Sequence, residues 1–288
     1  MRCQYWRFVA LRARYTHLHV GRRLNLLART LIDRTQRRRQ SDDGIEAPGF
    51  DVLQQIASEI SDDVWIVAPE TDQSGAAHSL TLHEPLRLRQ TGERTYAVRG
   101  TPTDCVIMGV RHILDDKRPD LVLSGVNRGA NIAEDVTYSG TIAAAFEAAL
   151  LGIRAIALSQ AFGIESKAPR WETAIAHAPD LLRRLIGETW GPDVLLNVNF
   201  PDRAPDAVAG TLITRQGRRE LELLSIDERR DTWGDPYYWL AYERKRSTTA
   251  AEGTDLWAIY QGYVSVTPLS LDLTHSQTHV ALKTRFGS

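Results

Sequence analysis

The chain has 288 residues, of which 43% are hydrophobic and 25% charged, and its formal net charge is -1. This composition is ordinary for a soluble globular protein and allows a sizeable core. Cys3 and Cys105 provide neither a disulfide framework nor a paired metal-ligand spacing, so a reducing, cytoplasmic location is expected. No run of about eighteen apolar residues predicts a transmembrane helix.

The first forty residues differ in charge from the rest. They contain eleven arginines and one acid, Asp33, whereas the remainder carries 24 basic and 35 acidic residues. A basic arm for nucleic acid is an alternative, but no aromatic pattern supports it, and nucleic acid is not expected as a partner. We expect residues 1–41 to be an atypical extension without a packed role or a misassigned start. Residues 42–288 then form the domain, with a core over 42–200 and an extension over 201–288.

Strands and helices alternate along the core. Spacing of apolar residues predicts helices, and continuous apolar runs bounded by turn residues predict buried strands. The helices are expected over residues 47–60, 103–114, 141–151 and 171–186, and the strands over 64–68, 96–98, 121–125, 155–158, 194–200 and 262–269. This alternation predicts an α/β fold with a mostly parallel sheet, right-handed crossovers and helices on both faces. Ligands in such folds bind at the carboxyl ends of the strands.

Asp42 and Asp43 stand directly before Gly44, ahead of the first predicted helix. In a tight loop two adjacent carboxylates can converge, and they then repel each other unless a cation lies between them. The alternative is a solvated Asp-Gly turn. Three arginines, residues 37–39, precede the pair and cannot form a buried strand. A strand leading into the site must come from elsewhere, such as residues 26–32, or be absent.

Two other loops offer further oxygen ligands. Ser74 has a hydroxyl and Asn127 an amide carbonyl. With the Asp pair these are hard donors, suited to Mg²⁺ or Mn²⁺. The alternatives are a turn at Ser74 and a left-handed backbone conformation at Asn127.

A phosphate cradle is predicted where the alanine-rich helix begins. Ser139, Gly140 and Thr141 open that helix, whose first backbone N–H groups are free to bind anions. Asn131 in the preceding loop is expected to donate to the same oxygens. Ser139 also fits a helix N-cap, and Asp104 a first-turn acid of the helix expected over 103–114. We expect His78 to be solvated.

Five ordered motifs resemble one known family. They are Asp42-Asp43-Gly44-Ile45-Glu46-Ala47-Pro48-Gly49, Val67-Ala68-Pro69 with Gln73-Ser74-Gly75, Gly100-Thr101-Pro102-Thr103-Asp104-Cys105, Ser124-Gly125-Val126-Asn127-Arg128-Gly129-Ala130-Asn131, and Tyr138-Ser139-Gly140-Thr141. Together they are similar to the survival protein SurE family, the metal-dependent 5'-nucleotidases, over about residues 42–275. The chain departs from the family pattern before the Asp pair, where the family has an apolar strand.

The resemblance implies a Rossmann-like core and a C-terminal β-rich oligomerisation extension exchanged between subunits of a homodimer or homotetramer. It implies hydrolysis of nucleoside 5'-monophosphates, with 3'-monophosphates and short polyphosphate as further substrates. It also implies one Mg²⁺ or Mn²⁺ per subunit, bound by Asp42, Asp43, Ser74 and Asn127.

We expect hydrolysis by a single cation, with Asp42 or Asp43 orienting or deprotonating the attacking water. Ser139, Gly140, Thr141 and Asn131 would hold the phosphate. One alternative is an aspartyl-phosphate phosphatase with Asp42 as nucleophile. Another is a catalytically impaired phosphate- or nucleotide-binding protein.

Overall fold

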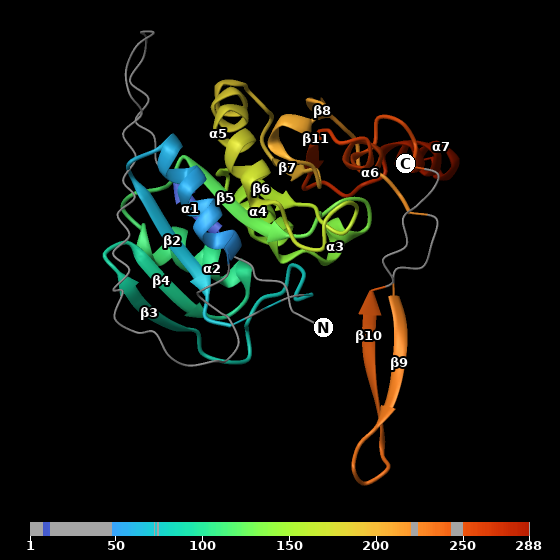
Figure 1. Ribbon diagram of the computed structural model, residues 1–288, viewed down its shortest axis with the longest axis horizontal. Helices are drawn as coiled ribbons and strands as arrows, with labels where there is room; N and C mark the ends of the chain where they lie inside the picture. The colour runs from blue at the N-terminus through green and yellow to red at the C-terminus, as the bar shows by residue number, and fades with distance from the viewer. Residues whose placement is uncertain are drawn as a thin grey trace.

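A computed structural model describes residues 8–11, 48–71, 73, 75–219, 224–242 and 250–287. A nine-stranded sheet, in the order β3-β4-β2-β1-β5-β6-β7-β11-β8, has helices on both faces (Figure 1). Its strands are β1 (Phe8–Leu11), β2 (Val64–Pro69), β3 (Arg87–Gly92), β4 (Thr95–Arg99), β5 (Leu121–Arg128), β6 (Arg154–Gln160), β7 (Val194–Phe200), β8 (Thr211–Ile213) and β11 (Val264–Ser270). The helices are α1 (Pro48–Ile60), α2 (Pro102–Met108), α3 (Asp135–Tyr138), α4 (Gly140–Leu150), α5 (Trp171–Gly187), α6 (Asp255–Tyr260) and α7 (Ser276–Phe286).

Five strands of this sheet, β4, β2, β5, β6 and β7, run in the same direction. Strands β3 and β11 pair antiparallel with β4 and β7. The predicted α/β class with a mostly parallel sheet is therefore confirmed. The helix expected over residues 103–114 consists of two parts, α2 and a π-helix over Gly109–Ile113 that continues it. The strand expected over residues 121–125 is longer, and β5 continues through Asn127.

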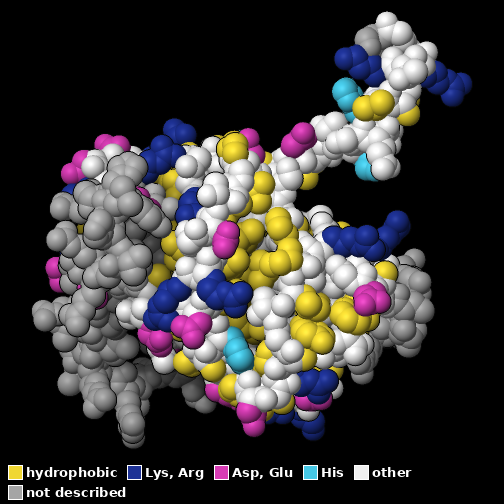
Figure 2. All heavy atoms as spheres, turned by 90° about the horizontal axis from the view of Figure 1, so that it is seen from above, with side chains coloured by type: hydrophobic (Ala, Val, Ile, Leu, Met, Phe, Trp, Pro, Cys, Tyr) yellow, Lys and Arg dark blue, Asp and Glu magenta, His cyan; other side chains and the backbone are white. Residues whose placement is uncertain are grey.

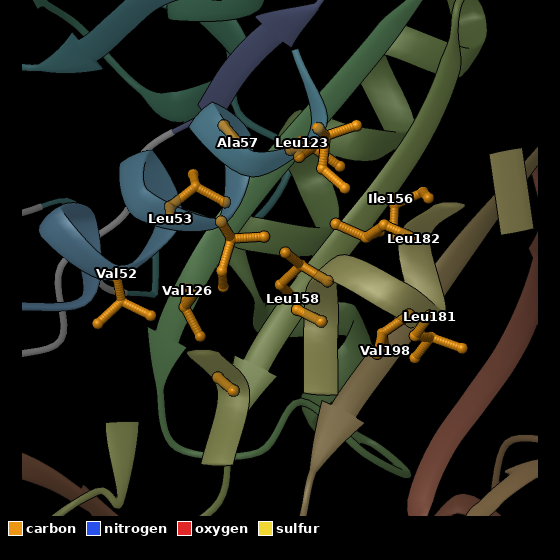
Figure 3. Packing of buried hydrophobic residues seen from close by; sticks show 14 of the residues in the cluster. Val52, Leu53, Ala57, Leu123, Val126, Ile156, Leu158, Leu181, Leu182 and Val198 are labelled. Atoms are coloured by element: carbon orange, nitrogen blue, oxygen red, sulfur yellow. The ribbon is translucent and has the colours of Figure 1, made fainter. Parts of the chain in front are cut away.

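The helices form two layers. Helices α1 and α5 cover one face of the sheet, and α2 and α4 cover the other. Figure 3 shows Leu53 of α1, together with Val126 and Leu158 of the sheet, among the side chains of the cluster on the α1 and α5 face. On the opposite face Ala144 and Ala148 of α4 pack in the cluster that contains Ala155 and Ala157 of β6. Small side chains on both sides let the helix approach the sheet closely, which keeps the start of α4 near the strand ends.

Strand β1 lies at the centre of the sheet. It pairs antiparallel with both β2 and β5, with Phe8 opposite Val67 and Ser124. The expectation that residues 1–41 have no packed role is therefore wrong for these four residues. A central strand needs apolar side chains, which residues 8–11 have and the arginines at 37–39 do not. The alternative source of the strand, residues 26–32, lies outside the described residues.

A proline in β1 tests whether this pairing contributes to stability. We expect Val9→Pro to lower the free energy of unfolding by about 2 kcal/mol or more, because a central strand loses a ladder hydrogen bond. Urea unfolding measures the change. Val9→Thr, which keeps the N–H and the β-branch, is the matched control. Equal stability of the two variants would show that the strand does not contribute.

Helix α1 approaches β5 very closely at its first turn. A Cβ added at Gly49 would lie 2.3 Å from the backbone oxygen of Val126 and 3.1 Å from the Trp171 ring. Only a residue without a side chain fits against that backbone atom. The start of α1 is thereby fixed beside the residue that precedes Asn127.

We expect Gly49→Ala to destabilise the protein by about 1–3 kcal/mol, because the added methyl group forces the helix away from the sheet. Gly187→Ala is the control, since a Cβ there has no atom within 4 Å. Thermal or urea unfolding of both variants checks the prediction. A loss no larger in Gly49→Ala than in the control would contradict it.

The C-terminal part adds β8, β11, α6, α7 and a hairpin of β9 (Leu224–Arg230) and β10 (Pro236–Tyr242), which extends away from the sheet (Figure 1). Large hydrophobic side chains are exposed on this hairpin and its turn, among them Ile226, Trp233 and Leu240. Figure 2 shows further hydrophobic side chains exposed among charged ones on the face seen from above. None of the described helices is long and apolar enough to cross a membrane.

Candidate functional site

A row of polar side chains crosses the carboxyl ends of three parallel strands. Asn127 of β5 is opposite Ser159 of β6, and Ser159 is opposite Asn199 of β7. All three side chains are buried. In a parallel α/β sheet this edge is where ligands bind, and the row lies in an otherwise apolar interior.

Asn127 presents an unused oxygen. Its residue is 1% exposed. Its Nδ2 donates to the backbone oxygen of Gly129 at 2.8 Å and to Oδ1 of Asn131 at 3.2 Å. Its Oδ1 is buried and receives no hydrogen bond from the described residues. Because an unpaired buried carbonyl is unfavourable, this oxygen calls for an external partner such as a cation.

The other predicted metal ligands, Asp42, Asp43 and Ser74, lie outside the described residues. On the C-terminal side of the Asp pair, the described chain approaches the site. Gly49, six residues after Asp43, packs against the backbone of Val126. Six residues span at most about 20 Å when extended, so Asp43 is within reach of Asn127. Among the described residues alone, no group of three His, Cys, Asp or Glu side chains could hold a metal.

The predicted phosphate cradle begins α4 at the same edge. Ser139 is the N-cap, and its side chain accepts from the backbone N–H of Ile142 at 3.1 Å. The N-cap alternative is therefore confirmed for Ser139. Gly140 and Thr141 follow and are buried, and Thr141 Oγ1 has no hydrogen-bond partner in the described part of the chain. A free hydroxyl beside free helix amides suits an anion.

The side chain of Asn131 is hydrogen-bonded within the protein. Its Oδ1 accepts from Asn127, and its Nδ2 donates to Ser159 Oγ at 2.8 Å. The residue is only 4% exposed. Its side chain is thus occupied on both sides by protein partners.

The loop between Asn131 and Ser139 is held by the C-terminal extension. Asp255 accepts from the backbone N–H of Ala133 and of Gly217. Arg219 donates to the backbone oxygen of Ile132 and to the Asp135 carboxylate. The sequence analysis missed these contacts, because the bonds that reach the 132–135 loop join residues more than 80 positions apart and no motif spacing marks them.

The carboxyl groups of Asp135 and Asp255 both have raised pKa values. Burial raises the pKa of Asp135, while the charge of Arg219 opposes the rise. Burial also raises the pKa of Asp255, against the effect of hydrogen bonds from Ala133, Gly217 and Leu256. Both shifts follow from placing a carboxylate where water is largely excluded.

Two other predicted side chains make more contacts than expected. His78 Nε2 lies 3.0 Å from Glu147 Oε2 on α4 and its ring packs edge-on against Phe146. Asp104 closes a capping box with Thr101 and also accepts two hydrogen bonds from Thr81. Asp104 thus holds Thr81 at the start of α2, the exposed His78 contacts α4, and neither residue is hydrogen-bonded to Asn127.

Comparison with known proteins agrees with this geometry. A family model described as "Survival protein SurE" matches residues 40–223. A protein of Rhodopseudomonas palustris (strain BisB18) named "5'-nucleotidase SurE" is 57% identical over 249 residues, covering 86% of this chain and 98% of that protein. The chain belongs to the SurE family. A SurE protein of Parvibaculum lavamentivorans, also named a 5'-nucleotidase, is 57% identical over 86% of this chain and 90% of its own length.

A solved SurE structure has the same fold. The crystal structure of the SurE protein from Aquifex aeolicus aligns with a TM-score of 0.72 and 42% sequence identity. The alignment covers 84% of this chain and 96% of that one. The suspected family is thereby confirmed, along with the Rossmann-like α/β class and a C-terminal strand extension.

The raised pKa of Asp135 predicts a specific pH dependence. A carboxyl whose pKa is raised by folding contributes stability below its unfolded pKa of about 4. That contribution is lost as the pH rises through the folded value. Asp135→Asn has no such ionisation. We therefore expect its free energy of unfolding, relative to the wild type, to increase from about pH 4 to neutral pH.

Urea unfolding at several pH values measures this difference, with Asp206→Asn as the control for loss of an exposed acid. A difference that stays constant across the range, or that moves in the opposite direction, would refute the assignment.

Proposed function

We propose that this SurE-family chain is a divalent-metal-dependent phosphomonoesterase that hydrolyses nucleoside 5'-monophosphates, and also 3'-monophosphates, to nucleoside and phosphate. The observation that carries the proposal is the buried, unpaired carbonyl oxygen of Asn127, at the carboxyl edge of the sheet. The relatives named "5'-nucleotidase SurE" support the substrate class. Short polyphosphate is a further proposed substrate.

The proposed metal ligands are Asp42, Asp43, Ser74 and Asn127, with one Mg²⁺ or Mn²⁺ per subunit. Asn127 fits this role because its free oxygen is a hard donor with no protein partner among the described residues. The carboxylates and the hydroxyl are of the same chemical kind, and none is a soft ligand that would select copper. The close approach of Gly49 to Val126 supports bringing the Asp pair to this edge.

The proposed phosphate cradle consists of Ser139, Gly140 and Thr141, at the start of an eleven-residue helix. Their backbone N–H groups and the Thr141 hydroxyl would bind phosphate oxygens and stabilise the charge that grows in the transition state. Asn131 is the further donor that the sequence predicts for this cradle.

When bound, the cation supplies Lewis acidity and makes a water molecule easier to deprotonate at neutral pH. Asp42 or Asp43 would orient that water and accept its proton. A thiol mechanism is not favoured, because burial raises the pKa of Cys105 well above its usual value and a buried thiol is a poor nucleophile.

Two alternatives remain. In an aspartyl-phosphate phosphatase, Asp42 would itself attack phosphorus, and a covalent phosphoaspartate could be trapped. In a nucleotide-binding protein without activity, phosphate would bind and no product would form. The antiparallel direction of β1 motivates the second alternative, since β1 does not lead directly into the Asp pair.

We further propose that the extension over 201–288 is an oligomerisation arm of a homodimer or homotetramer. Exposed apolar side chains on β9 and β10, such as Ile226 and Trp239, support it, because patches of this kind mark interaction sites. A cytoplasmic location is proposed with it.

The experiment is a phosphatase assay on metal-depleted protein with AMP. We expect phosphate release on addition of Mn²⁺ or Mg²⁺ and loss of release with a chelator. Asp43→Asn should lower kcat/KM by about 100-fold or more, because a proton acceptor is removed. Asp62→Asn, an exposed acid in the loop after α1, is the matched control and should retain full activity.

Release that is insensitive to chelator, or undiminished activity of Asp43→Asn, would contradict the metal mechanism. A trapped phosphoenzyme would favour the Asp42 nucleophile instead.

A further inference from the structure

A buried network of polar side chains lies next to Asn127. Asn131 is 4% exposed, and Ser159, Asn197 and Asn199 are each 0% exposed. They come from the loop after β5, from β6 and from β7. The proposed chemistry assigns no role to the last three, although burying several polar groups in a sheet core is unfavourable unless each is paired.

The backbone of Asn131 fixes the orientation of two of these amides. Its N–H donates to Asn199 Oδ1 at 2.8 Å. Its carbonyl oxygen accepts from Asn197 Nδ2 at 2.7 Å and from Asn199 Nδ2 at 3.3 Å. A backbone N–H can only donate and a carbonyl can only accept, so neither amide can be reversed. Both backbone groups of Asn131 are thereby held by β7.

The side chain of Asn131 links Ser159 to Asn127. Asn131 Nδ2 donates to Ser159, and Asn131 Oδ1 accepts from Asn127 Nδ2. Asn127 Nδ2 also donates to the carbonyl of Gly129. Two acceptors therefore surround one end of the Asn127 amide. A reversed amide would place its oxygen against both of them, so the oxygen must face the other way, where it has no described protein partner.

We propose that Asn131 is a positioning residue, held by Ser159, Asn197 and Asn199, which orients the Asn127 amide so that its carbonyl oxygen faces the cation. This inference rests on the proposed function, in which Asn127 is a metal ligand. It gives Asn131 a role other than the phosphate contact expected from the sequence, because its side chain is buried and already bonded on both sides.

The test compares Asn131→Leu with Asn131→Asp by titrating Mn²⁺ into the full-length, metal-depleted protein without substrate. Leucine removes the acceptor for Asn127, and we expect Mn²⁺ affinity to fall about 10- to 100-fold, as for other outer ligands of metal sites. Aspartate keeps an acceptor at the same place, so its Mn²⁺ affinity should equal or exceed that of the wild type. Circular dichroism and thermal unfolding confirm that each variant folds.

A phosphate contact by Asn131 gives the opposite pattern. Both variants would bind Mn²⁺ like the wild type, and KM for AMP would rise in both, most in Asn131→Asp, where a negative charge would face the phosphate. That result would overturn the proposal.

Ser159→Ala is the second variant and keeps the test decisive if Asn131→Leu does not fold. It removes the oxygen that holds Asn131 Nδ2, and we expect a smaller loss of Mn²⁺ affinity in the same direction. Unchanged affinity in Ser159→Ala and in every folded Asn131 variant, with a wild type that binds Mn²⁺, overturns this inference alone. A wild type that binds no Mn²⁺ overturns the proposed function with it.

Discussion

The arrangement of the site depends on pairing polar groups inside a sheet that is otherwise apolar. The row that begins at Asn127, Ser159 and Asn199 continues into β11, where Ser265 is opposite Asn199. Ser265 and Thr267 both hydrogen-bond Thr214 at 2.7 Å. The side-chain hydrogen bonds of this row join its members to one another, to Asn131, Asn197 and Thr214, or to nearby backbone groups. Within this row the carbonyl oxygen of Asn127 has no hydrogen-bond partner among the described residues, and beside the row the same holds for Gln160 Oε1.

Close packing of the apolar layers holds the row of polar side chains in place. Helix α1 is pressed against β5 at Gly49, and the alanine face of α4 lies close to β6. A core with such close contacts does not absorb a shift of one element without moving its neighbours. The loop of residues 132–135 is fixed on its outer side by Asp255 and Arg219. Packing from two sides and hydrogen bonds from a third hold the segments that carry Asn127 and Ser139.

Much of this was predictable from local pattern. Apolar runs located β2, β5, β6 and β7, and Ser74 and Asn127, which follow the runs of β2 and β5, led to the prediction of a site at the carboxyl edge of the sheet. Asn197 and Asn199, two positions apart in a buried strand, form a period-2 signal that could have revealed the network. Its partners could not be inferred, because they are the backbone groups of Asn131, in a loop more than 60 positions earlier in the sequence. The contacts of Arg219 and the use of residues 8–11 as a central strand depend on contacts between residues far apart in the sequence. A local sequence pattern does not show such contacts.

The direction of β1 has a consequence for how the carboxylates are tethered. Leu11, the last residue of β1, is opposite Val64 and Leu121, at the amino ends of β2 and β5. Gly49 contacts Val126, near the other end of β5. Along the sequence, Asp43 lies 32 positions after Leu11 and six before Gly49. The connection from the Asp pair to the described core is therefore short only on its C-terminal side. Closing a longer loop costs more entropy, and the proposed cation would have to offset the cost of the long N-terminal connection.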